Sequence, residues 1–187
     1  VRLGSTGEIS EFPDLPLDLF GHTITRLSDD RLLLVGGATG VCRSYSQDGP
    51  ATNRAFIYDP DNAGAGWLEV GSMKYPRALH RTIATYDGKA IVIGGGDGVC
   101  VNTIEISDQA ADCHEIFDPE IGANGGFVEV GTCSSPGKFA MPAVAYERDQ
   151  GVVTLAGVNA NGDGDSGTAF GIAVVGPRDL LNERSEE

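Results

Sequence analysis

No run of apolar residues in this chain approaches the roughly 18 that a membrane-spanning helix needs, so no membrane span is expected. Lysine is also scarce, with only Lys74, Lys89 and Lys138. The 13 basic residues are outnumbered by 27 acidic ones, which gives a formal charge of -14. Such a field repels the phosphates of nucleic acids and anionic lipids. We therefore expect no nucleic-acid partner.

Helical patterns are hard to find, whereas glycine is abundant, with 27 in 187 residues. The length suits a single domain with a sizeable core. The apolar segments are short, rich in Val, Ile, Leu, Phe and Tyr, and bounded by Gly, Asp, Asn and Pro. This pattern is typical of strands joined by turns. The composition therefore predicts an all-β domain.

An internal repeat of 58 to 60 residues organises the chain. RLLLVGG at 31–37 recurs as KAIVIGG at 89–95, and WLEVGSM at 67–73 recurs as FVEVGTC at 127–133. His22 with His80, and Asp59 with Asp118, show the same spacing. A weaker third copy covers 139–157 and continues at 168–177. In the second copy we predict strands at about 80–86, 89–95, 113–119 and 127–133. The turn Asp87-Gly88 joins the first two, so each copy is expected to be a four-stranded antiparallel sheet.

Several repeated residues resemble those of a kelch-type β-propeller blade over roughly residues 15 to 177. They are a double glycine after an apolar strand (Gly36-Gly37, Gly94-Gly95), a following aromatic (Tyr58, Phe117), a second aromatic (Trp67, Phe127), and the blade entry Pro76, Arg77 and His80. The period exceeds the usual kelch value of about 50 because the loop after the double glycine is long. The resemblance implies an all-β fold of kelch-type propeller blades, each with four antiparallel strands.

The third copy departs from this pattern, with Ala156-Gly157 in place of the double glycine and Ala140 in place of the histidine. A propeller needs about four to eight blades to close, and about three are found here, so we expect an incomplete ring. The predicted organisation is one partial propeller over 1–187. Its parts are 1–14 as the outer strand of a preceding blade, blade A at 15–75, blade B at 76–135, and a degenerate blade C with a tail at 136–187. We expect either that the chain is part of a longer propeller or that self-association completes the ring.

Four cysteines, Cys42, Cys100, Cys113 and Cys133, form an even number in an acidic chain, which favours an oxidising compartment. We therefore predict a secreted or cell-surface protein. A hairpin centred on residue 123 places Cys113 opposite Cys133 and leaves Cys42 with Cys100, which hold equivalent repeat positions. The alternative pairing joins Cys100 to Cys113 and Cys42 to Cys133. The third possibility is that all four are buried free thiols. No CxxC is present, so zinc is not expected.

A candidate calcium loop follows the strands of the third copy, with alternate oxygen ligands at Asn159, Asn161, Asp163 and Asp165 and a glycine between them. The twelfth position is Phe170, where an EF-hand has a bidentate glutamate. A polar turn is the alternative interpretation of the same residues. Apart from this Ca²⁺, no cofactor is predicted.

No catalytic residue is assigned. His22, His80 and Arg77 are expected on or beside strands near the propeller axis, but the histidines recur at one repeat position. Recurrence favours a repeated structural contact, and by the resemblance such residues fix blade to blade. His114, beside Glu115, is predicted to be a solvated surface residue.

The long stretches 38–52 and 96–112 exceed ordinary connections, and long loops on a rigid scaffold are typical binding sites. The leading hypothesis is a non-catalytic secreted or cell-surface kelch propeller that binds a protein or carbohydrate ligand through these loops. One alternative is an extracellular assembly subunit completed by other chains. Another is part of an enzyme, because the resemblance includes copper radical oxidases and sialic-acid epimerases. The oxidase set of a tyrosine cross-linked to cysteine and histidine ligands is not found among the three histidines.

Overall fold

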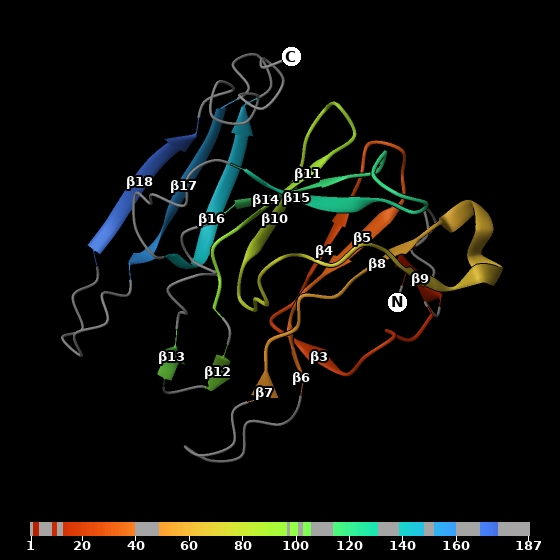
Figure 1. Ribbon diagram of the computed structural model, residues 1–187, viewed down its shortest axis with the longest axis horizontal. Coiled ribbons are helices and arrows are strands. Elements are labelled where there is room, and N and C mark those ends of the chain that lie inside the picture. Colours follow the sequence, from red (N-terminus) through yellow and green to blue (C-terminus); the bar gives the residue numbers. More distant parts are fainter. Residues whose placement is uncertain are drawn as a thin grey trace.

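The computed structural model describes residues 2–3, 9–10, 13–39, 49–96, 98–100, 103–105, 114–130, 139–147, 152–159 and 169–175. This part of the chain is mostly β-strand, arranged as several antiparallel sheets, none of them closed (Figure 1). The one helical segment in these ranges is the 3-10 helix η1 (Pro60–Ala65). None of the described helical structure has the length and hydrophobicity needed to span a bilayer. The prediction of an all-β, incomplete propeller-like fold is confirmed.

The first two repeat copies each form a four-stranded antiparallel sheet, here named sheet A and sheet B. Both have the same strand order, with consecutive strands paired along the sheet. In sheet A the strands are β4 (Thr23–Arg26), β5 (Leu32–Val35), β8 (Ala55–Tyr58) and β9 (Trp67–Glu69). In sheet B they are β10 (Arg81–Ala84), β11 (Ala90–Ile93), β14 (His114–Asp118) and β15 (Gly126–Val130). The four strands predicted for the second copy are therefore present, each within two or three residues of its expected bounds.

The third copy forms sheet C, with three described strands in the order β16-β17-β18. They are β16 (Phe139–Glu147), β17 (Val152–Asn159) and β18 (Ala169–Val175). Strand β10 lies beside both β4 and β16, so the first strands of the three sheets are neighbours. Figure 1 shows sheet B between sheet A and sheet C. The first strands therefore occupy the inner position that a propeller-like arrangement requires.

Short strands extend beyond these sheets at the ends that bear the long loops. Strand β3 (Leu19–Phe20) pairs with β6 (Ala38–Thr39), while β12 (Gly98–Cys100) pairs with both β13 (Thr103–Glu105) and β7 (Gly49–Pro50). Near the N-terminus, β1 (Arg2–Leu3) pairs with β2 (Ile9–Ser10). The assignment of residues 1–14 to a preceding blade remains a prediction.

The main core lies between sheets A and B. Alternate residues of the strands share a face, so Leu33, Val35, Ala55 and Ile57 of sheet A meet Ala90, Val92 and Phe117 of sheet B. Phe127 packs on Phe117 with ring centroids 5.4 Å apart. Each large apolar side chain that is fully buried contributes roughly 1.5–3 kcal/mol. This packing holds the two sheets at a fixed separation.

Candidate functional site

The segment from Pro76 to His80 links the outer strand of sheet A to the inner strand of sheet B, and Arg77 holds it to both. The backbone N–H of Arg77 donates to the carbonyl of Thr52 (3.2 Å), and its own carbonyl accepts from the N–H of Gly37 (2.9 Å). Its guanidinium Nη1 donates to the carbonyl of Gly94 (2.9 Å) and Nη2 to Oε1 of Glu115 (2.8 Å). One residue therefore ties together the double-glycine regions of two sheets.

Glu115 is the ion-pair partner of Arg77, and the sequence did not predict this role. Its side chain is buried, because β14 turns the same face toward sheet A at Glu115 as at Phe117. The carboxylate also accepts from the backbone N–H of Lys74 (Oε2, 2.6 Å) and of Tyr75 (Oε1, 3.3 Å). Burial lowers the pKa of Arg77, and the charge and hydrogen bond of Glu115 oppose that shift. The ion pair is thus buried, and each member also has hydrogen bonds to backbone groups.

His80 forms the inter-sheet contact that its recurrence predicted. The imidazole is fully buried, and its Nε2 lies 2.9 Å from Oγ1 of Thr23 on β4. The same hydroxyl lies 2.7 Å from Oγ1 of Thr82 on β10. Burial, followed by the charge of Arg77, lowers the pKa of His80 to about 3. A histidine that is neutral and hydrogen-bonded between two strands is suited to joining sheets rather than to proton transfer.

The other two histidines are also withdrawn from solvent. His22 is half-buried, and burial lowers its pKa. The prediction that His114 is a solvated surface residue is wrong. It lies on β14, the third strand of sheet B, it is half-buried, and burial lowers its pKa. His114 lies on the face of β14 opposite to Glu115, where Ile116 is also buried, so both faces of this strand are covered and neither His114 nor Glu115 is on an open surface.

The double glycines bring the backbones of consecutive segments into close approach. All four have positive φ, including 99° at Gly37 and 88° at Gly95. A Cβ at Gly95 would lie 2.6 Å from the carbonyl oxygen of Ala78, whose N–H and carbonyl both bond to Gly96. These glycines therefore serve the contact between the linking segment and the sheet.

The long loops of neighbouring sheets meet in a shared small sheet at this end of the molecule. Strand β7 belongs to the 38–52 loop and β12 to the 96–112 loop, and they pair antiparallel with Pro50 opposite Gly98 and Gly49 opposite Val99. Strand β13 then pairs with β12. Figure 1 shows β3, β6, β7, β12 and β13 gathered on one side of the molecule. We refer to these five strands as the loop face.

The disulfide predictions fall largely outside the described residues. Cys42, Cys113 and Cys133 lie outside them, and Cys100 is described only as the last residue of β12. The β14–β15 hairpin pairs His114 with Val130 and Asp118 with Gly126. Its centre is residue 122, not the expected 123, so the register that motivated pairing Cys113 with Cys133 is displaced by two residues. Both proposed pairings remain predictions.

The calcium loop is described only at its first residue. Asn159 is the last residue of β17 and pairs with Phe139 and Ala169, while Asn161, Asp163 and Asp165 lie outside the described residues. In the described part of the chain, no group of three or more His, Cys, Asp and Glu side chains is placed to hold a metal ion. Calcium binding remains a prediction.

Comparison with known protein families finds no match, and comparison with curated proteins also finds none. Among solved structures, the chain is similar to one described as a novel fungal alcohol oxidase with catalytic diversity among the AA5 family, in complex with copper. The TM-score is 0.59 at 19% sequence identity, over 86% of this chain. The match covers 32% of the oxidase, so this chain spans about a third of its length. At this identity the similarity shows the fold alone.

Proposed function

We propose that this chain is part of a kelch-type propeller outside the cell that binds a protein or carbohydrate ligand without catalysis, through the loop face. The observation that supports it best is the pairing of β7 with β12, which joins the loops of two sheets into one surface. The buried Arg77 and Glu115 link the segments beneath that surface. A loop surface on a rigid scaffold loses little conformational entropy on binding.

The proposal is tested by disrupting the backbone pairing of β12 while keeping an apolar residue at the substituted position. Val99→Pro removes a backbone donor from β12 and is expected to abolish binding to an oligosaccharide array or an array of extracellular proteins. Val99→Thr, which keeps the N–H and a β-branched side chain, is the matched control and is expected to bind like the parent. Equal array signals from the two variants for every ligand would contradict binding through the loop face.

A location outside the cell is proposed from the four cysteines and the acidic composition. Peptide mass mapping of the unreduced protein tests it, since each bridge removes two hydrogens and links two peptides. We expect two bridges, and the linked peptides distinguish the two pairings. Four free thiols in protein purified from an oxidising compartment would contradict the proposal.

An oxidase is the second candidate, favoured by the copper-containing structural neighbour. The described residues do not supply a fitting set of ligands, because Nε2 of His80 is hydrogen-bonded to Thr23 and the other two histidines come from different sheets. Metal analysis of the full chain after incubation with copper separates the two functions. One tightly held copper per chain, with peroxide released from a primary alcohol, would favour the oxidase.

A further inference from the structure

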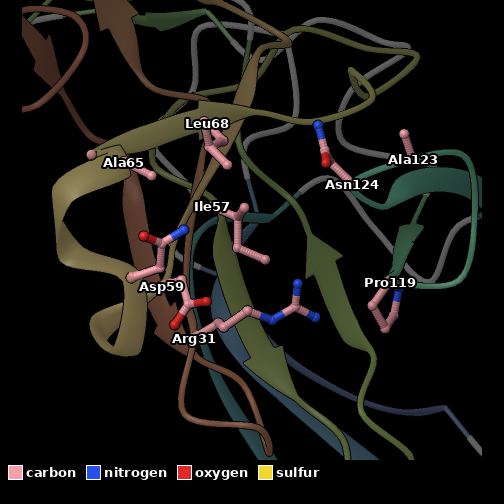
Figure 2. Close-up of a pocket in the computed structure, with 10 residues that line it drawn as sticks. Arg31, Ile57, Asp59, Ala65, Leu68, Pro119, Ala123 and Asn124 are labelled. Atoms are coloured by element: carbon pink, nitrogen blue, oxygen red, sulfur yellow. The ribbon is translucent and has the colours of Figure 1, made fainter.

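A small cleft of about 130 Å³ opens between sheets A and B at the strand ends opposite the loop face (Figure 2). Its residues come from the β4–β5 turn, from the β8–β9 connection with η1, and from the β14–β15 turn. The loop face is formed at the other ends of these strands. The cleft is therefore a separate feature from the proposed binding loops.

The floor of the cleft is apolar. Ile57 and Leu68 are direct cross-strand partners on β8 and β9, so their side chains lie on the same face of sheet A. Ile57 is buried in the core between the sheets, whereas Leu68 is 42% exposed and is one of the large apolar side chains that the described residues leave open to solvent. Figure 2 shows both side chains directed into the same space.

One wall is polar because the two repeats differ at equivalent positions. In sheet B, Nζ of Lys89 lies 2.9 Å from the carboxylate of Asp118 and closes that end of the sheet. The equivalent residues of sheet A are Arg31 and Asp59. Arg31 instead donates its Nε to Oδ2 of Asp29 (2.7 Å), with Nη2 2.6 Å from the same oxygen. Both the guanidinium of Arg31 and the carboxylate of Asp59 consequently line the cleft.

The carboxylate of Asp59 is held in place by the start of η1. Its Oδ1 accepts from the N–H of Asp61 at 2.9 Å, as an N-cap does. One oxygen keeps its orientation through this bond, and the carboxylate retains lone pairs for further donors.

The opposite wall is the β14–β15 turn of sheet B, which is docked on sheet A. The N–H of Gly71 donates to the carbonyl of Gly125 at 3.0 Å, and a Cβ at Gly71 would lie 2.9 Å from the Cα of Gly126. The turn therefore approaches sheet A closely and places Asn124 at the cleft. Asn124 is exposed, and Figure 2 shows its amide directed toward the space above Ile57.

We propose that this cleft binds one ring of a neutral sugar, as a free monosaccharide or as the end of a glycan. Its volume is well below the roughly 300 Å³ of ordinary ligand pockets, so it admits a single small ring. The C–H face of a pyranose fits the floor of Ile57 and Leu68, the Asp59 carboxylate accepts from hydroxyls, and the Asn124 amide both donates and accepts. Anions are disfavoured because Asp29 already neutralises Arg31 and the chain has a formal charge of -14. The inference is independent of what the loop face binds.

The test is saturation-transfer NMR on the full chain with the methyl glycosides of glucose, galactose and mannose, followed by titration of each that responds. At least one is expected to bind with a dissociation constant on the order of 1 mM, as suits a ligand of one ring. Sodium acetate and glucuronate are the anionic probes and are expected to bind more weakly. No response from any neutral glycoside, or a stronger response from the anions, would overturn the proposal.

Variants locate the binding. Asn124→Ala removes hydrogen bonds and is expected to weaken binding about fivefold, and Leu68→Ser is expected to weaken it by a similar factor. Both residues are exposed, so the thermal midpoints of the variants should match that of the parent. Val128→Ser is the matched control, since Val128 is the repeat equivalent of Leu68 in sheet B and is 40% exposed. A control that weakens binding as much as Leu68→Ser would place the sugar elsewhere.

Discussion

The guanidinium of Arg77 and the carboxylate of Glu115 lie 2.8 Å apart, and neither side chain exposes more than 1% of its surface. The pair joins the segment that leaves sheet A to the third strand of sheet B. Because each charge also has hydrogen bonds to backbone groups, the cost of removing both from water is offset locally. This contact fixes how the two sheets meet.

Removing one member of this pair should destabilise the protein strongly. Glu115→Ala leaves the charge of Arg77 buried without its counterion and deprives the N–H groups of Lys74 and Tyr75 of an acceptor. We expect a loss of about 3 kcal/mol or more in the free energy of unfolding, measured by urea titration.

Glu69→Ala is the matched control for Glu115→Ala. Glu69 pairs with Arg54 at 2.6 Å, but the two side chains are 46% and 40% exposed. An exposed pair contributes at most about 1 kcal/mol, so this variant should stay close to the parent. Equal losses in the two variants would show that burial of the Arg77–Glu115 pair does not matter.

The repeat in the sequence contained a signal for this pair. Arg77 and Glu115 stand where the first repeat has Leu19 and Phe56, so two apolar positions become oppositely charged in the same copy. The strands and the four-stranded sheets follow from local apolar patterns, which is why they could be predicted. The burial of Glu115 could not be predicted in this way, because it depends on a contact between residues 38 positions apart.

The sequence indicated the two long loops, but it did not predict that they pair with each other or that a cleft lies between sheets A and B. Glycine and proline at Gly49 and Pro50 indicate a turn, yet these residues pair with β12 of the next sheet. Similarly, the repeat predicts an ion pair between Arg31 and Asp59, equivalent to the one between Lys89 and Asp118. Arg31 bonds to Asp29 instead. The first outcome depends on a contact between distant segments, which a local pattern does not report. The second depends on a choice between two acidic partners of Arg31, one in its own turn and one just after β8, which the repeat does not decide.

The neutral state of His80 predicts a loss of stability in mild acid. Its pKa is about 3 in the folded protein and about 6.5 in an unfolded chain. As the pH falls below about 6.5, the unfolded state binds a proton that the folded state does not, so the free energy of unfolding decreases. The slope from this residue reaches about 1.4 kcal/mol per pH unit. Urea titrations between pH 7 and pH 5 measure it.

His80→Gln keeps a hydrogen-bonding group for Thr23 but does not titrate, so the pH slope of this variant should be shallower than that of the parent. A residual slope is expected from His22 and His114, whose pKa values burial also lowers. Identical slopes in the parent and the variant would show that His80 is not held neutral by the fold.

A side chain at Gly95 should be poorly tolerated. Gly95→Ala places a Cβ 2.6 Å from the carbonyl oxygen of Ala78, at a φ of 88° that alanine rarely adopts. We expect a loss of about 2 kcal/mol or more by thermal or urea unfolding. Gly64→Ala, with no atom within 4 Å of the new Cβ, is expected to change stability by less than about 0.5 kcal/mol. Similar stabilities for both variants would remove the close approach as the reason for glycine at 95.

The open sheets and the exposed Ile24 of sheet A predict association with another surface. Thr23 and Thr25 point toward sheet B, where both bond to Thr82 of β10, so Ile24 between them points the other way and is 46% exposed. Its cross-strand partner Leu34 and, on the next strand, Phe56 are already buried, so Ile24 is the apolar side chain that β4 leaves exposed on this face. Open sheets also leave strand edges unpaired, and an unpaired edge together with an exposed apolar side chain favours association. Sedimentation velocity over a concentration series should therefore show oligomers, and Ile24→Lys should shift them toward monomer. Ile121→Lys, at a site of similar exposure in a turn of sheet B, is the control and should leave the oligomers unchanged. A parent that is monomeric at every concentration would contradict completion of the ring by self-association.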